Sequence, residues 1–293
     1  MKVRLFVREM SLYRCIRCVS QSTCLNTIQY TLLHELIIHY VQTHTHRRKA
    51  VLFPTLPLDF VKDVKNAAGV SVNDVLFTCL SQAIHDYLQQ QECPVLKQQQ
   101  SHLLCRALIA AVLPRTVHDA AVETLQNKWF MLSSDLGIGS SRNNDILERL
   151  QYIHKHLSSL KTSPIPLVGL AHQNYIMPYL PRALNEQMTY NIFVRRSMSI
   201  SNVPGPTKTC LFANQPARGV HMFLSNIIPH VAFISYAGQI FGNMTLDPEA
   251  IPDAQSLSRH FGRAVATLAR RLKIEESKIP KDLVVVVEGQ AAP

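Results

Sequence analysis

The order of helix-like and strand-like segments most constrains how this chain can fold. Apolar residues recur at helical spacing over residues 58–68, 71–88, 144–160 and 253–272, and strand-like runs lie at 103–113 and 129–136. The two kinds of segment do not alternate strictly, as they do in chains that build all-parallel sheets. The pattern predicts an α+β fold, an α/β sandwich with a mixed sheet.

The helix expected after residue 70 has the clearest local signals. Gly69 is a helix breaker, and Ser71 can cap the free backbone donors of the first turn. Asp74 stands at the third helical position, which completes a capping-box pattern with Ser71. We therefore expect one helix to end at Gly69 and another to begin directly after Ser71.

The second half of the chain gives further expectations. A helix is expected over 168–180, a strand over 188–200 and a rigid turn over 202–206. Two antiparallel strands, 220–228 and 231–241, are expected to join at Pro229-His230. Asp253 is expected to cap the last helix, and the chain from Glu275 is expected to be loose, with Leu283–Val287 able to pair with a sheet edge.

Composition bounds the class of protein. With 47% hydrophobic and 17% charged residues, the chain can bury a core, and no apolar run approaches the roughly 18 residues of a membrane-spanning helix. Met1–Met10 shows no secretory signal, and seven scattered cysteines favour a reducing, intracellular compartment. The net charge of +10 favours phosphate-bearing partners, but Lys and Arg are too scattered to indicate nucleic-acid binding.

Residues 1–48 differ from the rest and are expected to be poorly ordered or to form one helix. Residues 49–273 are expected to be one domain, followed by a tail over 274–293.

Cys15-Ile16-Arg17-Cys18 has zinc-ligand spacing. A second pair is lacking, and Cys24 with His34 would complete the set irregularly. No metal site is therefore expected.

Several motifs occur in a specific order. Asn73-Asp74 opens a helix, Gln126–Phe130 and Asp145–Lys161 follow, and Asn202-Val203-Pro204-Gly205-Pro206 precedes Ser235-Tyr236-Ala237-Gly238 by about thirty residues. Over about 50–272 this order resembles the C-terminal region of wax ester synthase/acyl-CoA:diacylglycerol acyltransferases. The resemblance implies a chloramphenicol acetyltransferase-like, CoA-dependent acyltransferase fold, mostly its C-terminal half.

The same resemblance implies fatty acyl transfer from acyl-CoA to a long-chain alcohol or diacylglycerol, without a permanent cofactor, in the cytoplasm or at an endoplasmic reticulum membrane or lipid-droplet surface. Such transfer needs a base, which the family takes from a His-His-x-x-x-Asp-Gly motif. This sequence contains no adjacent histidine pair. We therefore expect an incomplete chain without turnover of its own. The alternative is a non-catalytic module that binds acyl-CoA, lipid or a partner.

The resemblance also nominates site residues. Asn73 and Asp74 belong to a motif that supports activity in the family, although a helix cap for Asp74 and a tie to a nearby loop for Asn73 explain them better than a direct catalytic role. The candidate wall of the acyl-CoA channel comprises Asn202, Pro204, Gly205, Pro206, Ser235, Tyr236 and Gly238, unless these residues only form tight turns. Arg195, Arg196 and Lys208 would suit CoA phosphates.

Two further expectations follow. As substitute bases, His85, His221 and His230 are each better explained as structural residues. A half-fold should also expose an apolar face and self-associate through it.

Overall fold

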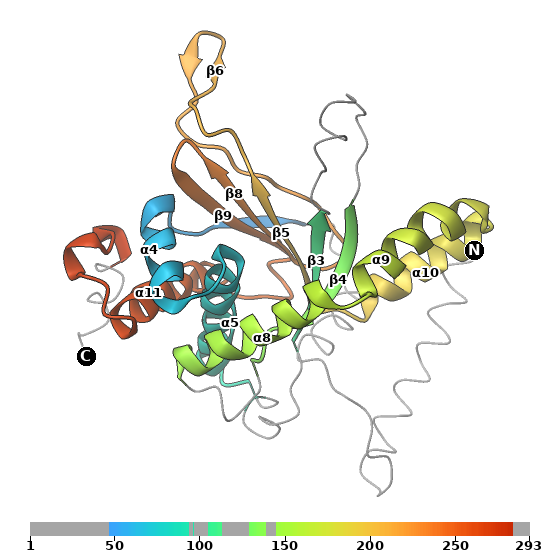
Figure 1. Cartoon of the computed structure of the whole chain (residues 1–293), viewed down its shortest axis with the longest axis horizontal. Coiled ribbons are helices and arrows are strands. Elements are labelled where there is room, and N and C mark those ends of the chain that lie inside the picture. The colour runs from blue at the N-terminus through green and yellow to red at the C-terminus, as the bar shows by residue number, and fades with distance from the viewer. Residues whose placement is uncertain (1–46, 94–95, 97–104, 113–128, 139–144, 284–293) are drawn as a thin grey trace, which may run out of the picture.

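The computed structural model describes residues 47–93, 96, 105–112, 129–138 and 145–283, which form one mixed sheet with helices packed against it (Figure 1). The main sheet has the order β1-β9-β8-β5-β3-β4, and β2 also pairs with β9. Its central pairs, β8 with β5 and β5 with β3, are parallel, whereas the outer pairs are antiparallel. The predicted α+β class with a mixed sheet is confirmed.

The strands of this sheet are short. Their bounds are Lys49–Leu52 (β1), Leu56–Pro57 (β2), Arg106–Val112 (β3), Trp129–Asp135 (β4), Met198–Pro204 (β5), His230–Tyr236 (β8) and Gln239–Leu246 (β9). A separate small hairpin joins β6 (Leu211–Phe212) to β7 (Gln215–Pro216). The predicted strands at 103–113 and 129–136 are confirmed where the structure describes them.

Four helices form the layer on one face of the sheet (Figure 1): α4 (Leu58–Ala68), α5 (Val72–Gln90), α8 (Ile146–Thr162) and α11 (Gln255–Arg271). They bury the apolar stripes that the sequence places at helical spacing. α4 ends at Gly69, whose φ of 68° is the left-handed conformation that glycine adopts at low cost. The four predicted helices are therefore confirmed.

An aromatic cluster joins the sheet to α11. The rings of Phe53 and Phe261 stack with their centroids 4.7 Å apart, and Phe233 lies 5.8 Å from Phe261. Gly242 on β9 makes this packing possible, because a Cβ there would come within 2.8 Å of the Phe233 ring. Gly242 therefore has a packing role.

The opposite face of the sheet is polar although it is buried. Ser199, His230, Asn243 and Thr245 lie on it. The segment between β7 and β8 covers part of this face, since Asn243 Nδ2 donates a hydrogen bond of 3.0 Å to the Met222 carbonyl. His230 Nδ1 lies 2.7 Å from Ser199 Oγ.

Several expectations for the second half are wrong. Residues 188–194 are helical, because α10 (Arg182–Val194) continues through the apolar run that favoured a strand, and extended structure begins only at Met198. Residues 220–228 form no strand. The antiparallel pair is β8 with β9, joined at Ala237-Gly238, where both residues have positive φ as a tight hairpin requires.

Two expectations at the C-terminal end are also wrong. The Asp253 side chain does not cap α11 but lies 3.6 Å from Arg259, and the N-cap residue, Ala254, supplies no side-chain bond. The segment after Glu275 is packed as far as Leu283, since Ile279 and Leu283 are buried and Lys278 Nζ bonds Asp63 of α4 at 3.0 Å. Most of the predicted strand at 283–287 lies outside the described residues, as do the predictions for residues 1–46.

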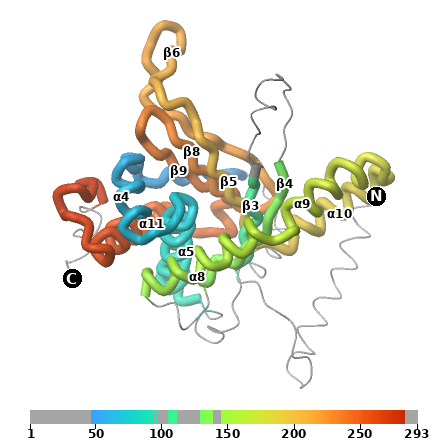
Figure 2. Tube along the Cα trace, viewed as in Figure 1, coloured from blue at the N-terminus to red at the C-terminus, as the bar shows by residue number. Residues whose placement is uncertain are grey.

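Residues 165–194 form an arm that lies beyond the edge strand β4 (Figures 1 and 2). The arm comprises α9 (Ile165–Ala171), a π-helical turn η1 (His172–Ile176), a 3-10 turn η2 (Met177–Tyr179) and α10. The predicted helix at 168–180 is thus three short helical pieces. Pro166 is the one buried residue in the arm.

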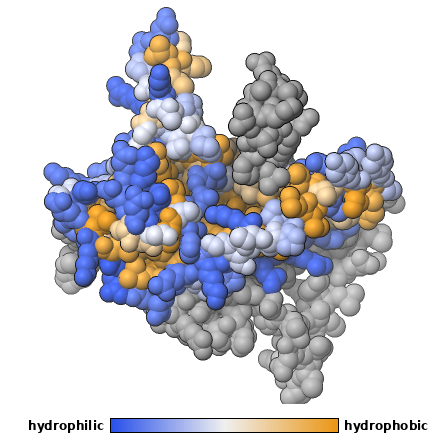
Figure 3. All heavy atoms as spheres, in the orientation of Figure 1, coloured by the Kyte–Doolittle hydropathy of each residue, from blue (hydrophilic) through white to orange (hydrophobic). Residues whose placement is uncertain are grey.

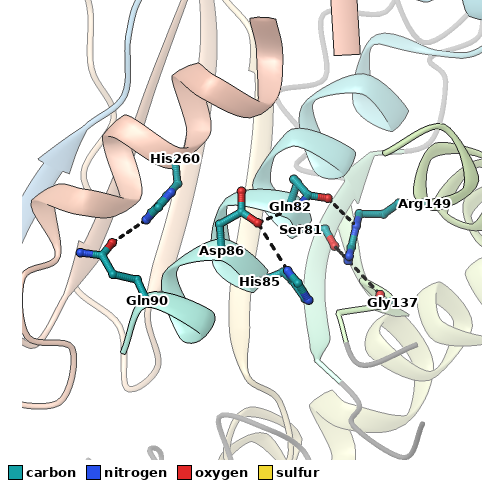
Figure 4. A network of polar contacts seen from close by, with 8 residues as sticks. All are labelled: Ser81, Gln82, His85, Asp86, Gln90, Gly137, Arg149 and His260. Carbon is teal, nitrogen blue, oxygen red and sulfur yellow. Dashed lines mark hydrogen bonds and ion pairs between the residues drawn. The ribbon is translucent and has the colours of Figure 1, made fainter. Parts of the chain in front are cut away.

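A buried arginine connects two of the core helices (Figure 4). Arg149 of α8 is fully buried, and its Nη1 donates to Ser81 Oγ and to the Gly137 carbonyl, each at 2.9 Å. Its Nε donates to Gln82 Oε1 at 3.1 Å. Burial lowers the pKa of Arg149 to about 10, against the opposing influence of Asp86 and Asp135, so the guanidinium is charged at neutral pH.

We expect Arg149→Leu to lower the free energy of unfolding by about 3 kcal/mol, because it leaves buried acceptors on α5 and at Gly137 without their donor. Urea denaturation measures this loss. Arg182→Leu is the matched control, since Arg182 forms only an exposed pair with Glu186 in the described part of the chain, and we expect no measurable change in stability. Equal losses in the two variants would contradict the role of Arg149.

Candidate functional site

The N-terminus of α5 carries the first candidate motif. Ser71 Oγ accepts from the Asp74 backbone N–H at 3.3 Å, and the Ser71 N–H donates to Asp74 Oδ2 at 2.8 Å. This is the predicted capping box, which is confirmed. Asp74 is nevertheless only 1% exposed, far more buried than a cap requires.

A histidine that the motif analysis missed explains this burial. His154 of α8 places Nδ1 2.9 Å from Asp74 Oδ2, while its own side chain is 43% exposed. The imidazole therefore covers the buried carboxylate and reaches solvent. The only signal in the sequence was its position directly after Ile153, which lies in the buried stripe of α8.

The residue next to Asp74 binds the central sheet. Asn202 Nδ2 of β5 donates to Asn73 Oδ1 at 2.5 Å, across 129 residues of sequence. Two motifs that were identified separately thus meet in one contact. From the sequence, a structural role for Asn73 is expected to be a bond to a nearby loop. Its partner in the structure is instead the strand β5.

The exit of β5 is held rigidly against β8. Asn202, Val203 and Pro204 belong to β5 itself, so the predicted turn at 202–206 begins only after Pro204, which is a correction. The Gly205 N–H donates to the Ser235 carbonyl at 2.9 Å, and Pro206 accepts from the Ala237 N–H at 3.0 Å. A Cβ on Gly205 would collide with the Ser235 carbonyl oxygen, so glycine is required by this close approach.

Tyr236 and Gly238 complete this junction. The Tyr236 hydroxyl accepts from the Cys210 N–H and donates to the Ala217 carbonyl, each at 2.9 Å, and the side chain is buried. Tyr236 therefore clamps both ends of the β6–β7 hairpin. Gly238 has a φ of 79° in the β8–β9 turn, and its carbonyl accepts from the Leu58 N–H. These contacts suit the tight-turn interpretation of 235–238.

The three basic residues suggested for CoA phosphates do not lie together. Arg195 and Arg196 precede the N-terminal end of β5, whereas Lys208 follows its C-terminal end. A strand of seven residues spans about 23 Å. A single phosphate group cannot contact both ends.

Comparison with known proteins identifies the domain that holds most of these residues. Residues 125–269 match the family model of the WS/DGAT C-terminal domain. Over this stretch, slightly less than half of its length, the chain resembles the wax ester synthase/diacylglycerol acyltransferase (WS/DGAT) family. It is 24% identical over 223 residues to wax ester synthase/diacylglycerol acyltransferase 11 of Arabidopsis thaliana, which covers 69% of this chain and 44% of that relative.

The fold is that of a solved WS/DGAT. The structure matches the wax ester synthase/diacylglycerol acyltransferase from Marinobacter aquaeolei VT8 with a TM-score of 0.53 and 17% identity, over 86% of this chain and 58% of that one. The predicted CoA-dependent acyltransferase fold is confirmed. This chain spans less than two thirds of the length of each of these two relatives.

The WS/DGAT domain match also shows what the contacts at α5 accomplish. Asn73 and Asp74 precede the matched residues, whereas their partners Asn202 and His154 lie within them. The α5 N-terminus is therefore bonded at two adjacent residues to the WS/DGAT C-terminal domain. Whether Asn73 and Asp74 also act in catalysis stays a prediction.

The three histidines considered as substitute bases have structural contacts. His85 Nδ1 lies 3.4 Å from Asp86 (Figure 4), and His221 packs edge-on against Phe241. Buried His230 bonds Ser199. The described residues contain no group of three or more His, Cys, Asp or Glu that could hold a metal ion.

No single helix in the described part of the chain is long and apolar enough to cross a membrane. In length and composition, only α4 and α5 taken together would suffice there, and these two helices are bent by 94° relative to each other.

We expect Asp74→Ala to destabilise the protein by about 2 kcal/mol, because it removes both the capping box and the carboxylate under His154. Asp59→Ala is the control. Asp59 also lies in a first helical turn, but its side chain is 92% exposed and, among the described residues, pairs only with Lys62. Thermal unfolding of the two variants compares them, and a smaller loss in Asp74→Ala than in the control would refute the role of the buried node.

Acid should weaken the fold through the buried histidines. Burial lowers the pKa of His230 and of His260 below the ordinary value of 6.5. The unfolded state therefore takes up protons first, so stability is fully present above about pH 6.5 and falls as the pH drops towards the lowered values.

We expect His230→Gln to lessen this loss of stability between about pH 7 and pH 5, since glutamine does not titrate. The measurement is urea denaturation at a series of pH values. Gln173→Asn, which replaces a residue of the arm that does not titrate, serves as the control and should keep the slope of the unaltered protein. An unchanged slope in His230→Gln would contradict the assignment.

Proposed function

We propose that this chain forms the acyl-CoA-binding half of an O-acyltransferase that esterifies a long-chain alcohol or a diacylglycerol. The observation that carries the proposal is the WS/DGAT C-terminal domain match over residues 125–269, which contains the β5 exit and the Ser235–Gly238 turn. The names of the relatives support wax esters and triacylglycerol as the class of product.

The proposed reaction needs both a catalytic base and a binding surface for acyl-CoA. Attack of a hydroxyl on a thioester needs a base for the hydroxyl proton and donors for the oxyanion. The 293 residues hold no His-His-x-x-x-Asp-Gly motif. In our proposal the base therefore comes from another polypeptide segment, and this chain supplies substrate binding.

The proposed channel wall is the exit of β5. Pro204 and Pro206 are exposed there, and Asn202 is partly exposed with its amide held by Asn73. Two prolines and the Gly205–Ser235 contact leave this segment little freedom, so it presents a pre-organised surface to an acyl-CoA thioester arm. Buried Tyr236 belongs to β8, which pairs with β5, and its hydroxyl holds the hairpin that follows the β5 exit.

Titration calorimetry with a long-chain acyl-CoA tests the binding role, and we expect saturable binding. Gly205→Ala should weaken the affinity about tenfold, because the added Cβ displaces the β5 exit from Ser235. Gly169→Ala is the control, since a Cβ there meets no atom within 4 Å. Absence of saturable binding, or equal affinity of the two variants, would overturn the proposal.

A turnover assay separates the two functions that remain. With labelled acyl-CoA and a fatty alcohol or diacylglycerol, we expect the chain alone to form no ester above background. Robust turnover would overturn the proposal that the base comes from another polypeptide segment. Binding without turnover, even when an N-terminal WS/DGAT half is added, would favour the alternative of a non-catalytic acyl-CoA-binding module.

A further inference from the structure

The arm exposes an unusual amount of apolar surface. Apart from Pro166 all its residues are exposed or only partly buried. Figure 3 shows apolar residues gathered over α9 and α10. The exposed large apolar side chains of the arm are Ile165, Leu167, Val168, Tyr175, Ile176, Tyr179, Leu184 and Ile192. A helical segment that buries almost nothing in its own fold needs a partner to offset the exposure.

Charge along this segment has a definite arrangement. Residues 162–181 contain no Asp, Glu, Lys or Arg. Lys155 and Lys161 precede this stretch, and Arg182, Arg195 and Arg196 follow it, with Glu186 the single acidic residue from 150 to 200. An uncharged apolar stretch with basic flanks is complementary to a surface that is apolar inside and anionic outside.

Positive charge is concentrated at the inner end of α10. Burial, with the nearby charges of Arg106 and Arg195, lowers the pKa of Arg196. Neither Arg195 nor Arg196 forms a salt bridge with an acidic residue in the described part of the chain, and Arg196 Nε is buried without a hydrogen-bond partner there. Crowded arginines of this kind favour phosphate-bearing groups.

We infer that the arm binds the surface of an anionic phospholipid membrane, with Tyr175, Ile176 and Tyr179 inserted among the lipids and Arg195 and Arg196 on headgroup phosphates. Tyrosine prefers the boundary between hydrocarbon and water because its ring is apolar and its hydroxyl is polar. At 74% and 85%, Tyr175 and Tyr179 are among the most exposed large apolar residues of the arm.

The lengths of the helical pieces exclude a crossing of the bilayer by either one. α9 has 7 residues and α10 has 13, whereas a spanning helix needs about 20. Pro166, Pro178 and Pro181 interrupt the segment, as an element that lies within the interface tolerates. The inference does not depend on acyl transfer, because its test measures only lipid binding.

Co-sedimentation with vesicles tests the inference. We expect the full chain to bind vesicles of phosphatidylcholine with phosphatidylserine better than phosphatidylcholine alone, and to bind less as salt rises from about 0.1 to about 0.5 M. The combined variant Tyr175→Ser, Ile176→Ser, Tyr179→Ser should lose about tenfold or more in binding. Arg195→Gln with Arg196→Gln should remove most of the preference for phosphatidylserine.

The matched control is Leu211→Ser with Phe212→Ser, which removes exposed apolar side chains from β6, away from the arm, and should bind like the unaltered chain. Tyr175, Ile176 and Tyr179 are exposed, so we expect their substitution to leave folding intact, which circular dichroism and thermal melting check for every variant. The inference is overturned if the unaltered chain binds neither vesicle or if the arm variant binds as well as the control. The inference is also overturned if the unaltered chain forms a concentration-dependent dimer and the arm variant loses this dimer but still binds vesicles. That result would make the arm a self-association surface.

Discussion

The buried guanidinium of Arg149 is the interaction on which the helical layer depends. A fully buried positive charge is tolerated only when hydrogen-bond acceptors surround it. For Arg149 these acceptors are Ser81 Oγ, Gln82 Oε1 and the Gly137 carbonyl. These acceptors set the register between the antiparallel helices α5 and α8. Further along the same pair of helices, that register brings His154 of α8 to Asp74 of α5.

The α5 N-terminus connects the helical layer to the end of β5. Asp74 is bonded within its own turn and to α8, while adjacent Asn73 is bonded to Asn202 at the end of β5. A single turn of helix therefore positions the strand exit that we propose as a wall for acyl-CoA. The motif needs no catalytic proton transfer of its own to matter for activity, because displacing this turn would displace Asn202 and the segment beyond it.

The helices of the core bury their apolar side chains within the chain, whereas the helices of the arm leave theirs exposed. α11 buries its apolar face against α5 and the Phe53–Phe233 cluster, so its stability comes from within the chain. α10 buries no residue, so its apolar side chains are available to an external surface. In our two proposals together, the arm would hold a poorly soluble acceptor alcohol close to the β5 exit that binds acyl-CoA.

The sequence by itself determined the elements that depend on neighbours a few residues away: the Ser71–Asp74 capping box, the end of α4 at Gly69 and the amphipathic stripe of α8. The ordered motifs also predicted the resemblance to WS/DGAT enzymes, which the domain match over residues 125–269 bears out. Only the tertiary structure decided that residues 188–194 are helical, that β8 pairs with β9, and that Asn73 meets Asn202 and Asp74 meets His154. The physical reason is that strand propensity is mostly packing against partners, and the contact between Asn73 and Asn202 joins residues 129 positions apart, which no local pattern encodes.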